Sequence, residues 1–465
     1  MHIQTSLKFG LAAAAALAAS AGAAAAQNVT PGAYNAPLTE SSISGISSGA
    51  YMAVQFATAW SSVIKGVGAI AGGPFGCSGG WASTALSTCM GGAPAANVGK
   101  LSGLIDKLAA NGAIDDPANI TRQKVYLFNG YNDKIVMRPV SNWLDTIYTG
   151  RLGGKQAANL FYQTAIGSGH AQVTLNYGRK CSDSVADYFD DCRYDQAGVI
   201  LQHIYGALAA PNRGTLGGTF VSFSQAQFTA PAAPADYSMG DQAFLYVPAD
   251  CAGGAACRMH IALHGCKQSY TNIGDKFVRN AGYNEWADTN HIIVLYPQTA
   301  PVAKFPPFGP LNLEACWDWW GYLDKDPSSD PRFLTKAAPQ IDAIKRMLDQ
   351  LTSGAQPAAP VAAAGPQVLV ANDATDTAIA LAWTAVPGAT GYEVFRQGPG
   401  QSAFASIGTV TGLSFGDKNM KAKTSYQYQV RPILVSGPGA LSVAVTKATH
   451  PTVPRCIEPG TCRIS

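Results

Sequence analysis

The sequence predicts an α/β domain followed by a small all-β domain, and three observations support this. Residues 27 to about 352 mix short apolar runs with patterns typical of amphipathic helices, as α/β folds do. An Ala- and Pro-rich linker follows over residues 353–365. Beyond it, over residues 366–450, apolar and polar residues alternate with the period of β-strands. Residues 451–465 form a tail that is too short to be a domain.

Composition excludes several classes of protein. Charged residues make up only 13% of the 465, and the net charge of +3 gives no basis for nucleic-acid binding. Met1–Ala26 reads as a secretory signal peptide, with Lys8, an Ala/Leu-rich run and Ala24–Ala26 before Gln27. A membrane anchor is the alternative, but the run is short, and no later segment has the ~20 continuous apolar residues of a spanning helix. We expect a secreted monomer, extracellular or periplasmic, that binds neither nucleic acid nor membrane.

All ten cysteines follow the signal segment, and an even number in an exported chain suggests disulfides. Sequence spacing does not prove connectivity, but pairing of near neighbours is the simplest expectation. It gives Cys77–Cys89, Cys181–Cys192, Cys251–Cys257, Cys266–Cys316 and Cys456–Cys462. Metal binding is the alternative, but no CxxC pair or histidine cluster accompanies these cysteines. We therefore expect neither a metal nor another cofactor.

A serine motif near the N-terminus organises the first domain. The stretch Ser44–Ala50 contains Gly45-x-Ser47-x-Gly49, the nucleophile-elbow pattern of α/β-hydrolases. The residues after it read as a helix, which would place main-chain N–H groups behind the serine.

Two alternatives to this interpretation of the serine motif exist. The pattern can be a glycine-rich turn without chemistry. A second match surrounds Ser78, but Gly79 and Gly80 would begin a helix badly, and the adjacent Cys77 suggests a structural role.

Buried strands and an amphipathic helix follow in order. Apolar runs predict strands over Val63–Ile70, Lys124–Phe128, Arg258–Leu263 and His291–Tyr296. The apolar spacing between Phe333 and Leu351 predicts a helix with one buried face.

A serine nucleophile needs a base and an orienting carboxylate, which follow it as Asp and then His in α/β-hydrolases. Asp133 lies in a glycine-containing loop after a predicted buried strand, where the site of such a sheet must be. His170 follows on a loop of small residues. A turn-forming aspartate and an exposed loop histidine are the alternatives. The other histidines lie in the signal segment, in apolar strands, in a packed helix or past the last domain.

An oxyanion hole usually takes one N–H from the residue after the nucleophile, here Ser48, and one from a loop with an HG-type motif. The motif His264-Gly265-Cys266 supplies the second, and we expect the His264 side chain to hold the loop rather than to catalyse. This motif normally precedes the serine, whereas here it follows His170. We infer a circularly permuted α/β-hydrolase domain, because a sheet can be cut at a new place when the surface termini are close.

Together these stretches resemble the extracellular polyhydroxyalkanoate depolymerases, of the poly(3-hydroxybutyrate) type with an N-terminal serine motif. The resemblance rests on Ser44–Ala50, Ala71–Phe75, Asn129–Asp133, Gly169–His170, Leu263–Gln268 and Cys316–Tyr322. It implies that the nucleophile, acid, base and oxyanion donor fall on Ser47, Asp133, His170 and the Cys266 N–H. In such enzymes a polymer-binding domain usually follows a fibronectin-type linker. This chain departs from that pattern, because only the Cys456/Cys462 tail follows.

Two further aromatic patterns bear on function. Trp317, Trp319 and Trp320 would form an apolar wall for a polyester chain, with burial in the core as the alternative. After the linker, strands are predicted around Trp383, Tyr392 and Tyr428, and the spacing of Thr424-x-Tyr426-x-Tyr428-x-Val430 resembles a fibronectin type III domain with its tyrosine corner. Such a module has no chemistry of its own and would act as a spacer or binding platform.

The sequence thus predicts a serine esterase that cleaves poly(3-hydroxybutyrate) or its oligomers through an acyl-enzyme. An esterase for feruloyl or acetyl groups on plant polysaccharide is an alternative, because some such enzymes share the HGC-type loop. A third interpretation is a non-catalytic exported binding protein, against which the complete Ser, Asp and His set argues.

Overall fold

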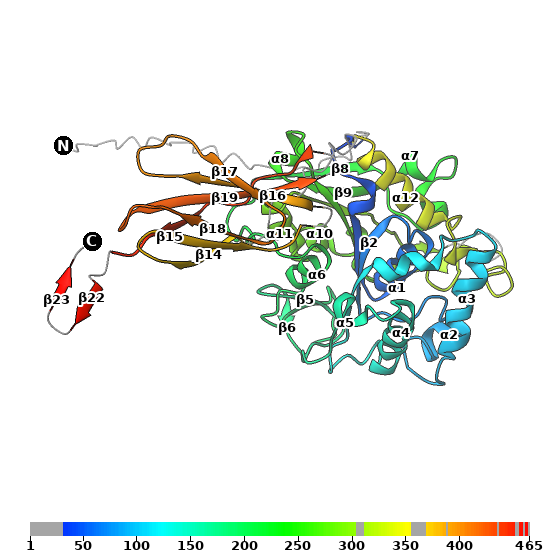
Figure 1. Ribbon diagram of the computed structural model, residues 1–465. Helices are drawn as coiled ribbons and strands as arrows, with labels where there is room; N and C mark the ends of the chain where they lie inside the picture. The colour runs from blue at the N-terminus through cyan, green and yellow to red at the C-terminus, as the bar shows by residue number, and fades with distance from the viewer. Residues whose placement is uncertain are drawn as a thin grey trace, which may run out of the picture. The chain divides into compact units, whose positions relative to one another are not determined.

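Two compact units make up the chain in the computed structural model, and they divide between Gln356 and Pro357. The structure describes residues 31–303, 311–354, 369–386, 389–434, 437–451, 455–458 and 461–463. Figure 1 shows the two units as an α/β body and an all-β body. The predicted signal peptide and most of the linker lie outside the described residues.

A mixed eight-stranded sheet forms the centre of the N-terminal unit. Across the sheet, its strands are β4 (Leu160–Gln163), β3 (Lys124–Phe128), β2 (Ile64–Ile70), β1 (Ser41–Ile46), β10 (Arg258–Leu263), β11 (Ile292–Tyr296), β9 (Gln242–Val247) and β8 (Thr219–Ser224). The six strands from β4 to β11 pair in parallel, and the last two pair antiparallel. The carboxyl ends of the parallel strands therefore meet at one edge, where sites of such sheets lie.

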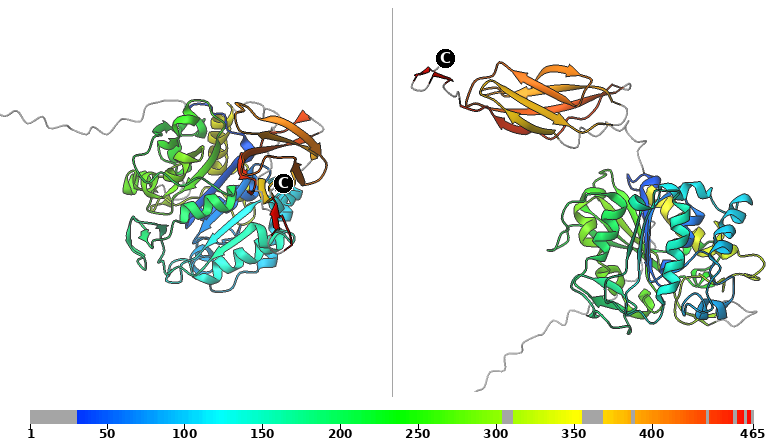
Figure 2. Two further views of the ribbon diagram at one scale, coloured as in Figure 1. Left: turned by 60° about the vertical axis from the view of Figure 1, so that its left-hand side comes forward. Right: turned by 60° about the horizontal axis from the view of Figure 1, so that its bottom comes forward.

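Helices cover both faces of this sheet, as the edge-on view in Figure 2 shows. Apolar side chains join one face to α1 (Ser48–Ala59), α3 (Val98–Ala110), α4 (Arg138–Arg151) and α12 (Pro339–Thr352). A second apolar cluster joins the other face to α6 (Gln196–Tyr205), α10 (Lys276–Asn280) and α11 (Tyr283–Thr289). The two clusters are the two halves of a three-layer core.

Short elements connect these layers. The short helices are α2 (Ala82–Ser87), α5 (Gln156–Asn159), α7 (Ala226–Thr229), α8 (Ala249–Ala252) and α9 (Tyr270–Ile273), with 3-10 turns η1 (Leu38–Glu40), η2 (Pro117–Arg122), η3 (Pro234–Tyr237) and η4 (Arg332–Leu334). Two small sheets contain β5 (Gln172–Thr174), β7 (Phe189–Asp191) and β6 (Arg179–Lys180), and β12 (Val302–Ala303) with β13 (Leu311–Asn312).

The permuted strand order is confirmed. β10 lies more than two hundred residues after β1 in the chain, yet it pairs with β1 in parallel, with Gly45 opposite Leu263. The strand that leads into the predicted oxyanion motif is thus the direct neighbour of the strand that leads into Ser47. This is the arrangement of an α/β-hydrolase in which β8 to β11 follow the nucleophile strand in the sequence instead of preceding it.

The four predicted strands of this unit form, with β3 and β10 at the expected bounds. The expected helix over Phe333–Leu351 begins only at Pro339, because proline is favoured at a first helical position, while Phe333 lies in the 3-10 turn η4.

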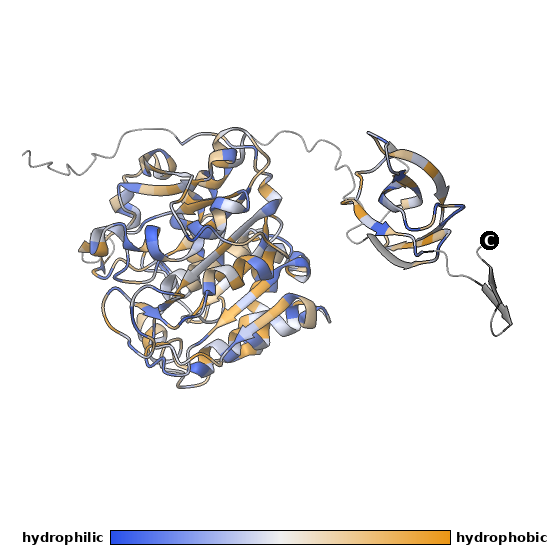
Figure 3. Cartoon of the chain, turned by 90° about the vertical axis from the view of Figure 1, so that its left-hand side faces the viewer, coloured by the Kyte–Doolittle hydropathy of each residue, from blue (hydrophilic) through white to orange (hydrophobic). Residues whose placement is uncertain are grey.

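A β-sandwich forms the C-terminal unit. One sheet contains β14 (Leu369–Ala374), β15 (Ala378–Trp383) and β18 (Ser414–Lys418), and the other contains β17 (Ala405–Val410), β16 (Ala389–Gln397), β19 (Ser425–Leu434), β20 (Gly437–Pro438) and β21 (Val445–Ala448). Both apolar and polar stretches are visible on the strands of this unit that Figure 3 colours. Trp383, Tyr392 and Tyr428 lie in its core. The Tyr426 hydroxyl accepts a hydrogen bond from the Lys421 N–H at 3.1 Å, which is the geometry of a tyrosine corner.

In the tail, β22 (Arg455–Glu458) pairs antiparallel with β23 (Thr461–Arg463). The predicted Cys456–Cys462 disulfide lies outside the described side chains. None of the helices in the described ranges is long and apolar enough to cross a membrane.

Candidate active site

Ser47 occupies a strained turn between strand β1 and helix α1. Its backbone has φ 56° and ψ −122°, values that a residue with a side chain rarely adopts. Its N–H donates to the Ile70 carbonyl on the neighbouring strand at 2.9 Å, and its own carbonyl accepts from the Tyr51 N–H at 3.1 Å. The turn is therefore fixed on both sides, as a nucleophile elbow requires.

The glycines that flank Ser47 are needed for space. A Cβ on Gly45 would lie 2.3 Å from the Gly49 carbonyl oxygen, and a Cβ on Gly49 would lie 2.4 Å from the His264 carbonyl oxygen. Only glycine permits this approach of strand, helix and oxyanion loop. The strain in the turn is carried by Ser47 itself rather than by the glycines.

Asp133 and His170 form a buried pair at the same edge of the sheet. The Asp133 carboxylate accepts from His170 Nδ1 at 2.9 Å, and the two side chains are 0% and 5% exposed. The other carboxylate oxygen accepts from the N–H groups of Ile135 and Val136 at 2.8 and 3.0 Å. This arrangement places the imidazole proton on Nδ1 and leaves the Nε2 lone pair free to act as a base.

A small subdomain supports the His170 loop from outside. The His170 N–H donates to Ser184 Oγ at 2.7 Å, and the Gly169 N–H donates to the Cys181 carbonyl at 2.9 Å. The Cys181–Cys192 disulfide closes this segment. Beneath it, the buried Asp190 carboxylate also accepts from the Gly169 N–H, at 3.1 Å, and burial raises the pKa of this carboxyl to about 7.

The predicted oxyanion loop follows β10, and the His264 side chain holds it through hydrogen bonds. His264 Nδ1 donates to the Gly265 carbonyl at 2.7 Å, and Nε2 accepts from the Thr299 N–H at 3.2 Å. Burial lowers the pKa of His264 to about 4, so its imidazole is neutral at neutral pH. The C=O and N–H of a trans peptide point in opposite directions, so this bond turns the Cys266 N–H away from His264. The His264 side chain therefore lies in the structural position expected from the sequence.

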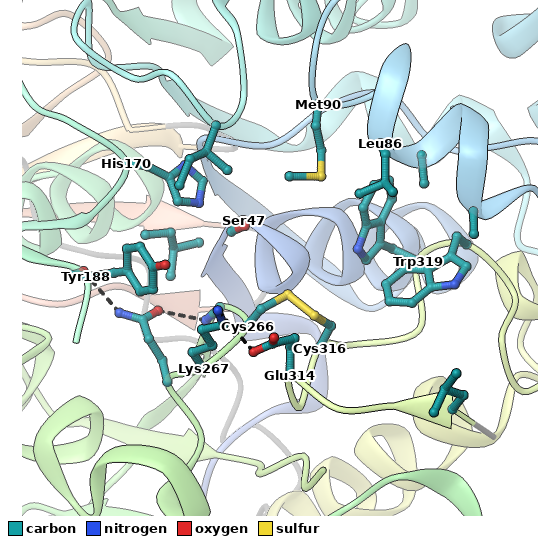
Figure 4. Close-up of a pocket in the computed structure, with 18 residues that line it drawn as sticks. Ser47, Leu86, Met90, His170, Tyr188, Cys266, Lys267, Glu314, Cys316 and Trp319 are labelled. Carbon is teal, nitrogen blue, oxygen red and sulfur yellow. Dashed lines mark hydrogen bonds and ion pairs between the residues drawn. A yellow bond between two sulfur atoms is a disulfide. The ribbon is translucent and has the colours of Figure 1, made fainter. Parts of the chain in front are cut away.

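The elbow, the loop that carries His170 and the loop that carries Cys266 meet at one cavity of about 440 Å³ (Figure 4). Ser47, His170 and Cys266 all line it. Most of the remaining wall is apolar, and it includes Ile46, Ala82, Ala85, Leu86, Met90, Ile135, Leu311, Trp319 and Trp320. The size and lining are those of a small-molecule site with few polar groups.

The three tryptophans do not share one role. Trp319 and Trp320 line the cavity, and Trp319 stacks on Tyr51 with ring centroids 4.2 Å apart. The expectation that Trp317 belongs to this wall is wrong. Its side chain is fully buried and donates from Nε1 to the His264 carbonyl at 2.9 Å, so it supports the oxyanion loop instead.

Four of the five predicted disulfides form: Cys77–Cys89, Cys181–Cys192, Cys251–Cys257 and Cys266–Cys316. Both cysteines of the last pair line the cavity, so this disulfide joins the oxyanion loop to the segment that carries Trp319. The rival serine, Ser78, is fully buried and donates to the Trp319 carbonyl at 3.2 Å. Ser78 therefore supports the main chain at Trp319 and does not face the cavity as a nucleophile would.

Several residues of the cavity are not marked by any sequence motif. Leu86 and Met90 come from the segment around the Cys77–Cys89 disulfide, and Tyr188 comes from the loop beside His170. No motif marks them, because only the folded chain brings their loops to the cavity. Gln268, in contrast, ends the stretch Leu263–Gln268 that carries the family resemblance, but the sequence assigned it no role. Within the described ranges, no group of three or more His, Cys, Asp or Glu side chains could hold a metal ion.

The permuted sheet, the serine at its elbow and the Asp–His pair define a serine hydrolase of the α/β-hydrolase class. Comparison with known proteins narrows this class. No family model matches the chain. A poly(3-hydroxybutyrate) depolymerase of Delftia acidovorans is 39% identical over 416 residues, which cover 88% of this chain and 79% of the relative. A polyhydroxybutyrate depolymerase of Talaromyces funiculosus is 37% identical over 340 residues, or 70% of this chain and 93% of the relative.

A solved structure agrees with these relatives. A serine-to-alanine variant of a PHB depolymerase in complex with an R3HB trimer superposes with a TM-score of 0.63 and 34% identity. The match covers 70% of this chain and 99% of that structure. The chain belongs to the poly(3-hydroxybutyrate) depolymerase family.

Proposed function

We propose that this protein hydrolyses the ester bonds of poly(3-hydroxybutyrate) or its oligomers through an acyl-enzyme. The observation that carries the proposal is that Ser47, at its strained elbow, and the Asp133-oriented His170 line one cavity. The two relatives named above are depolymerases of this polymer, and the similar solved structure holds an R3HB trimer.

The reaction follows from the geometry of the site. Ser47 Oγ attacks the ester carbonyl while His170 Nε2 takes the hydroxyl proton and then delivers it to the departing alcohol. Water, deprotonated by the same nitrogen, then attacks the acyl-enzyme, and the His170 imidazolium returns the proton to Ser47 Oγ as the acid is released. Asp133 keeps the imidazole in the required tautomer and stabilises the imidazolium.

The negative charge of the tetrahedral intermediate needs donors that are already in place. The N–H groups of Ser48 and Cys266 are the candidates, because Ser48 begins helix α1 and the Gly265–Cys266 peptide is held by His264. Among the hydrogen bonds of the described residues, neither N–H has a protein acceptor. Both are therefore free to bind an oxyanion.

The apolar wall suits a methyl-bearing aliphatic polyester. Trp319 and Trp320 offer rigid apolar surface on one side of the cavity, and Leu86 and Met90 extend it. Among the described residues that line the cavity, Lys267 and Glu314 are the Lys, Arg, Asp or Glu side chains, and these two form an ion pair at 3.2 Å. The wall thus favours neutral, uncharged ester units.

We also infer that the protein acts outside the cytoplasm as a monomer, with 27–352 as the catalytic domain and 366–450 as a separate module. The four disulfides support an oxidising compartment.

Clearing of a poly(3-hydroxybutyrate) suspension, compared with release of ferulate or acetate from plant polysaccharide, tests the substrate. Clearing without ferulate or acetate release supports the proposal, and the reverse result contradicts it. Absence of any turnover of p-nitrophenyl butyrate would instead favour a binding protein.

A further inference from the structure

The side chain of Gln268 lies buried between two loops of the cavity wall. It is 1% exposed, and its amide oxygen accepts from the Gly265 N–H at 2.9 Å. Its amide nitrogen donates to the carbonyls of Asp187 and Tyr188, at 2.9 and 3.0 Å. An amide side chain offers two N–H donors and one carbonyl, so one residue bridges both loops with all its polar groups satisfied.

One end of this bridge is the oxyanion loop. Gly265 lies directly against the nucleophile, because a Cβ on Gly265 would come within 3.3 Å of Ser47 Cβ. Its carbonyl is held by His264 and its N–H by Gln268. Both the carbonyl and the N–H of Gly265 are therefore held by hydrogen bonds, and this fixes the orientation of the peptide that carries the Cys266 N–H.

The other end is the turn beside the proposed base. Asp187 and Tyr188 have φ values of 75° and 47°, a conformation that non-glycine residues adopt only when their surroundings hold them. The Tyr188 ring lies edge-on to the His170 ring, with centroids 6.0 Å apart. The Tyr188 carbonyl also accepts from the Gln172 N–H at 2.8 Å, two residues after His170. Gln268 is thus hydrogen-bonded to the turn whose Tyr188 ring packs on His170.

We propose that Gln268 is a positioning residue. It holds the proposed oxyanion donor, the Cys266 N–H, in a fixed position relative to the turn that packs on His170. The inference rests on the proposed function, because it concerns the same acyl transfer. The Cys266 N–H and the His170 imidazole lie on loops far apart in the chain, and both must meet one tetrahedral intermediate. Donors stabilise a transition state only when they are placed before the reaction, and misplacement by about 1 Å is costly.

The first test replaces the amide by an apolar side chain of similar length. In Gln268→Met all three hydrogen bonds are lost while the volume is roughly kept. Gln123→Met is the matched control. Gln123 is fully buried and donates to the carbonyls of Ala57 and Ile64, at 2.9 and 3.2 Å, just before β3 and therefore at the opposite edge of the sheet.

Both variants should unfold at a lower temperature than the wild type. On p-nitrophenyl butyrate, only Gln268→Met should lower kcat, by roughly tenfold or more, with KM changed less than about twofold, because loss of a whole oxyanion donor costs about a hundredfold or more. Inhibition by a trifluoromethyl ketone, which adds to Ser47 as a hemiketal, should weaken by the factor by which kcat/KM falls. A purely structural glutamine would not produce that match.

Gln268→Glu separates the two halves of the bridge and also serves if Gln268→Met does not fold. A carboxylate can still accept from the Gly265 N–H but cannot donate to the Asp187 and Tyr188 carbonyls, so kcat should fall here as well. If the folded Gln268 variants keep kcat within twofold of Gln123→Met, the inference is wrong. If the wild type itself turns over no ester, the proposed function fails instead, so the two failures are distinguishable.

Discussion

The main-chain N–H of Tyr34 donates to the carbonyl of Leu351 at 2.7 Å, which joins the first and last segments of the N-terminal unit. Nearby, a Cβ on Gly354 would lie 2.8 Å from the Ala33 carbonyl carbon and oxygen. The two ends of the α/β unit are therefore neighbours, and this adjacency is what a circular permutation requires.

A chain with the strand order of an unpermuted hydrolase should therefore fold. We predict that residues 32–354, with these ends joined by a short Gly/Ser linker and new ends opened at the exposed bond between Gly214 and Thr215, keep most of the p-nitrophenyl butyrate activity. Circular dichroism and turnover measure the outcome. A rearranged chain that stays unfolded would contradict the prediction and show that folding needs the intact connection between β4 and β8.

The nucleophile is tested by a pair of serines. Ser47→Ala should lower kcat by at least roughly a thousandfold, because the acyl-enzyme cannot form. Ser78→Ala should keep activity within a few-fold and lose about 1 kcal/mol of stability with its hydrogen bond to the Trp319 carbonyl. Labelling by a fluorophosphonate probe, followed by peptide mapping, identifies the reactive serine. A label on Ser47→Ala elsewhere in the site would contradict the assignment.

The sequence could predict the centre of the site because its residues lie in local motifs. Gly45-x-Ser47-x-Gly49 and His264-Gly265-Cys266 each require a particular turn, and the buried strands before Asp133 and His264 place both at one sheet edge. Burial decided what local pattern could not. Trp317 and Trp319 are chemically alike and two residues apart, yet only the fold shows that one supports the loop while the other faces the cavity.

The same limit applies to the strands at the sheet margins. β4 and β8 are edge strands with several exposed or half-exposed residues, so their apolar signal is weak. The link from Gln268 to Tyr188 joins residues eighty positions apart and leaves no local trace at all. Long-range contacts of this kind determine the shape of the cavity beyond its catalytic motifs.

Removal of the Cys266–Cys316 disulfide should impair both stability and turnover. The bridge closes a loop with a sequence separation of 50, which corresponds to about 4 kcal/mol in the chain-entropy account. The double variant Cys266→Ala/Cys316→Ala should also lower kcat, because it releases the oxyanion loop from the Trp319 segment. Removing Cys251–Cys257, which lines no part of the cavity, should cost about 2 kcal/mol for its separation of 6 and leave kcat unchanged. Equal kcat in both double variants would contradict a role in turnover.

Stability should depend on pH through Asp190. Burial raises the pKa of its carboxyl from the ordinary 3.8 to about 7, so between these values the folded chain binds more protons than the unfolded chain. The contribution of Asp190 to the free energy of unfolding therefore falls as the pH rises from about 4 to about 7. Asp190→Asn removes this contribution, so the stability of the variant relative to the wild type should increase over that range. Urea unfolding at several pH values measures it, and a constant difference would refute the assignment.

Recognition of the polymer should depend on the cavity wall rather than on the C-terminal unit. Trp320 is partly exposed on that wall and packs edge-on against Trp319, with ring centroids 5.4 Å apart. Trp320→Ala removes apolar surface from the cavity wall. Several ester units of a polymer can contact this surface, whereas a short soluble ester contacts little of it. We expect hydrolysis of amorphous poly(3-hydroxybutyrate) granules to fall more than that of p-nitrophenyl butyrate.

Truncation after Gly354 keeps helix α12 whole and removes the sandwich. It should leave hydrolysis of the soluble ester almost unchanged, because Ser47, Asp133 and His170 all belong to the N-terminal unit. Its effect on granules should be modest. Comparing Trp320→Ala and the truncation on both substrates decides between the two units. If the truncation abolishes granule hydrolysis while Trp320→Ala matches the wild type, polymer recognition resides in the sandwich and not in the wall beside Ser47.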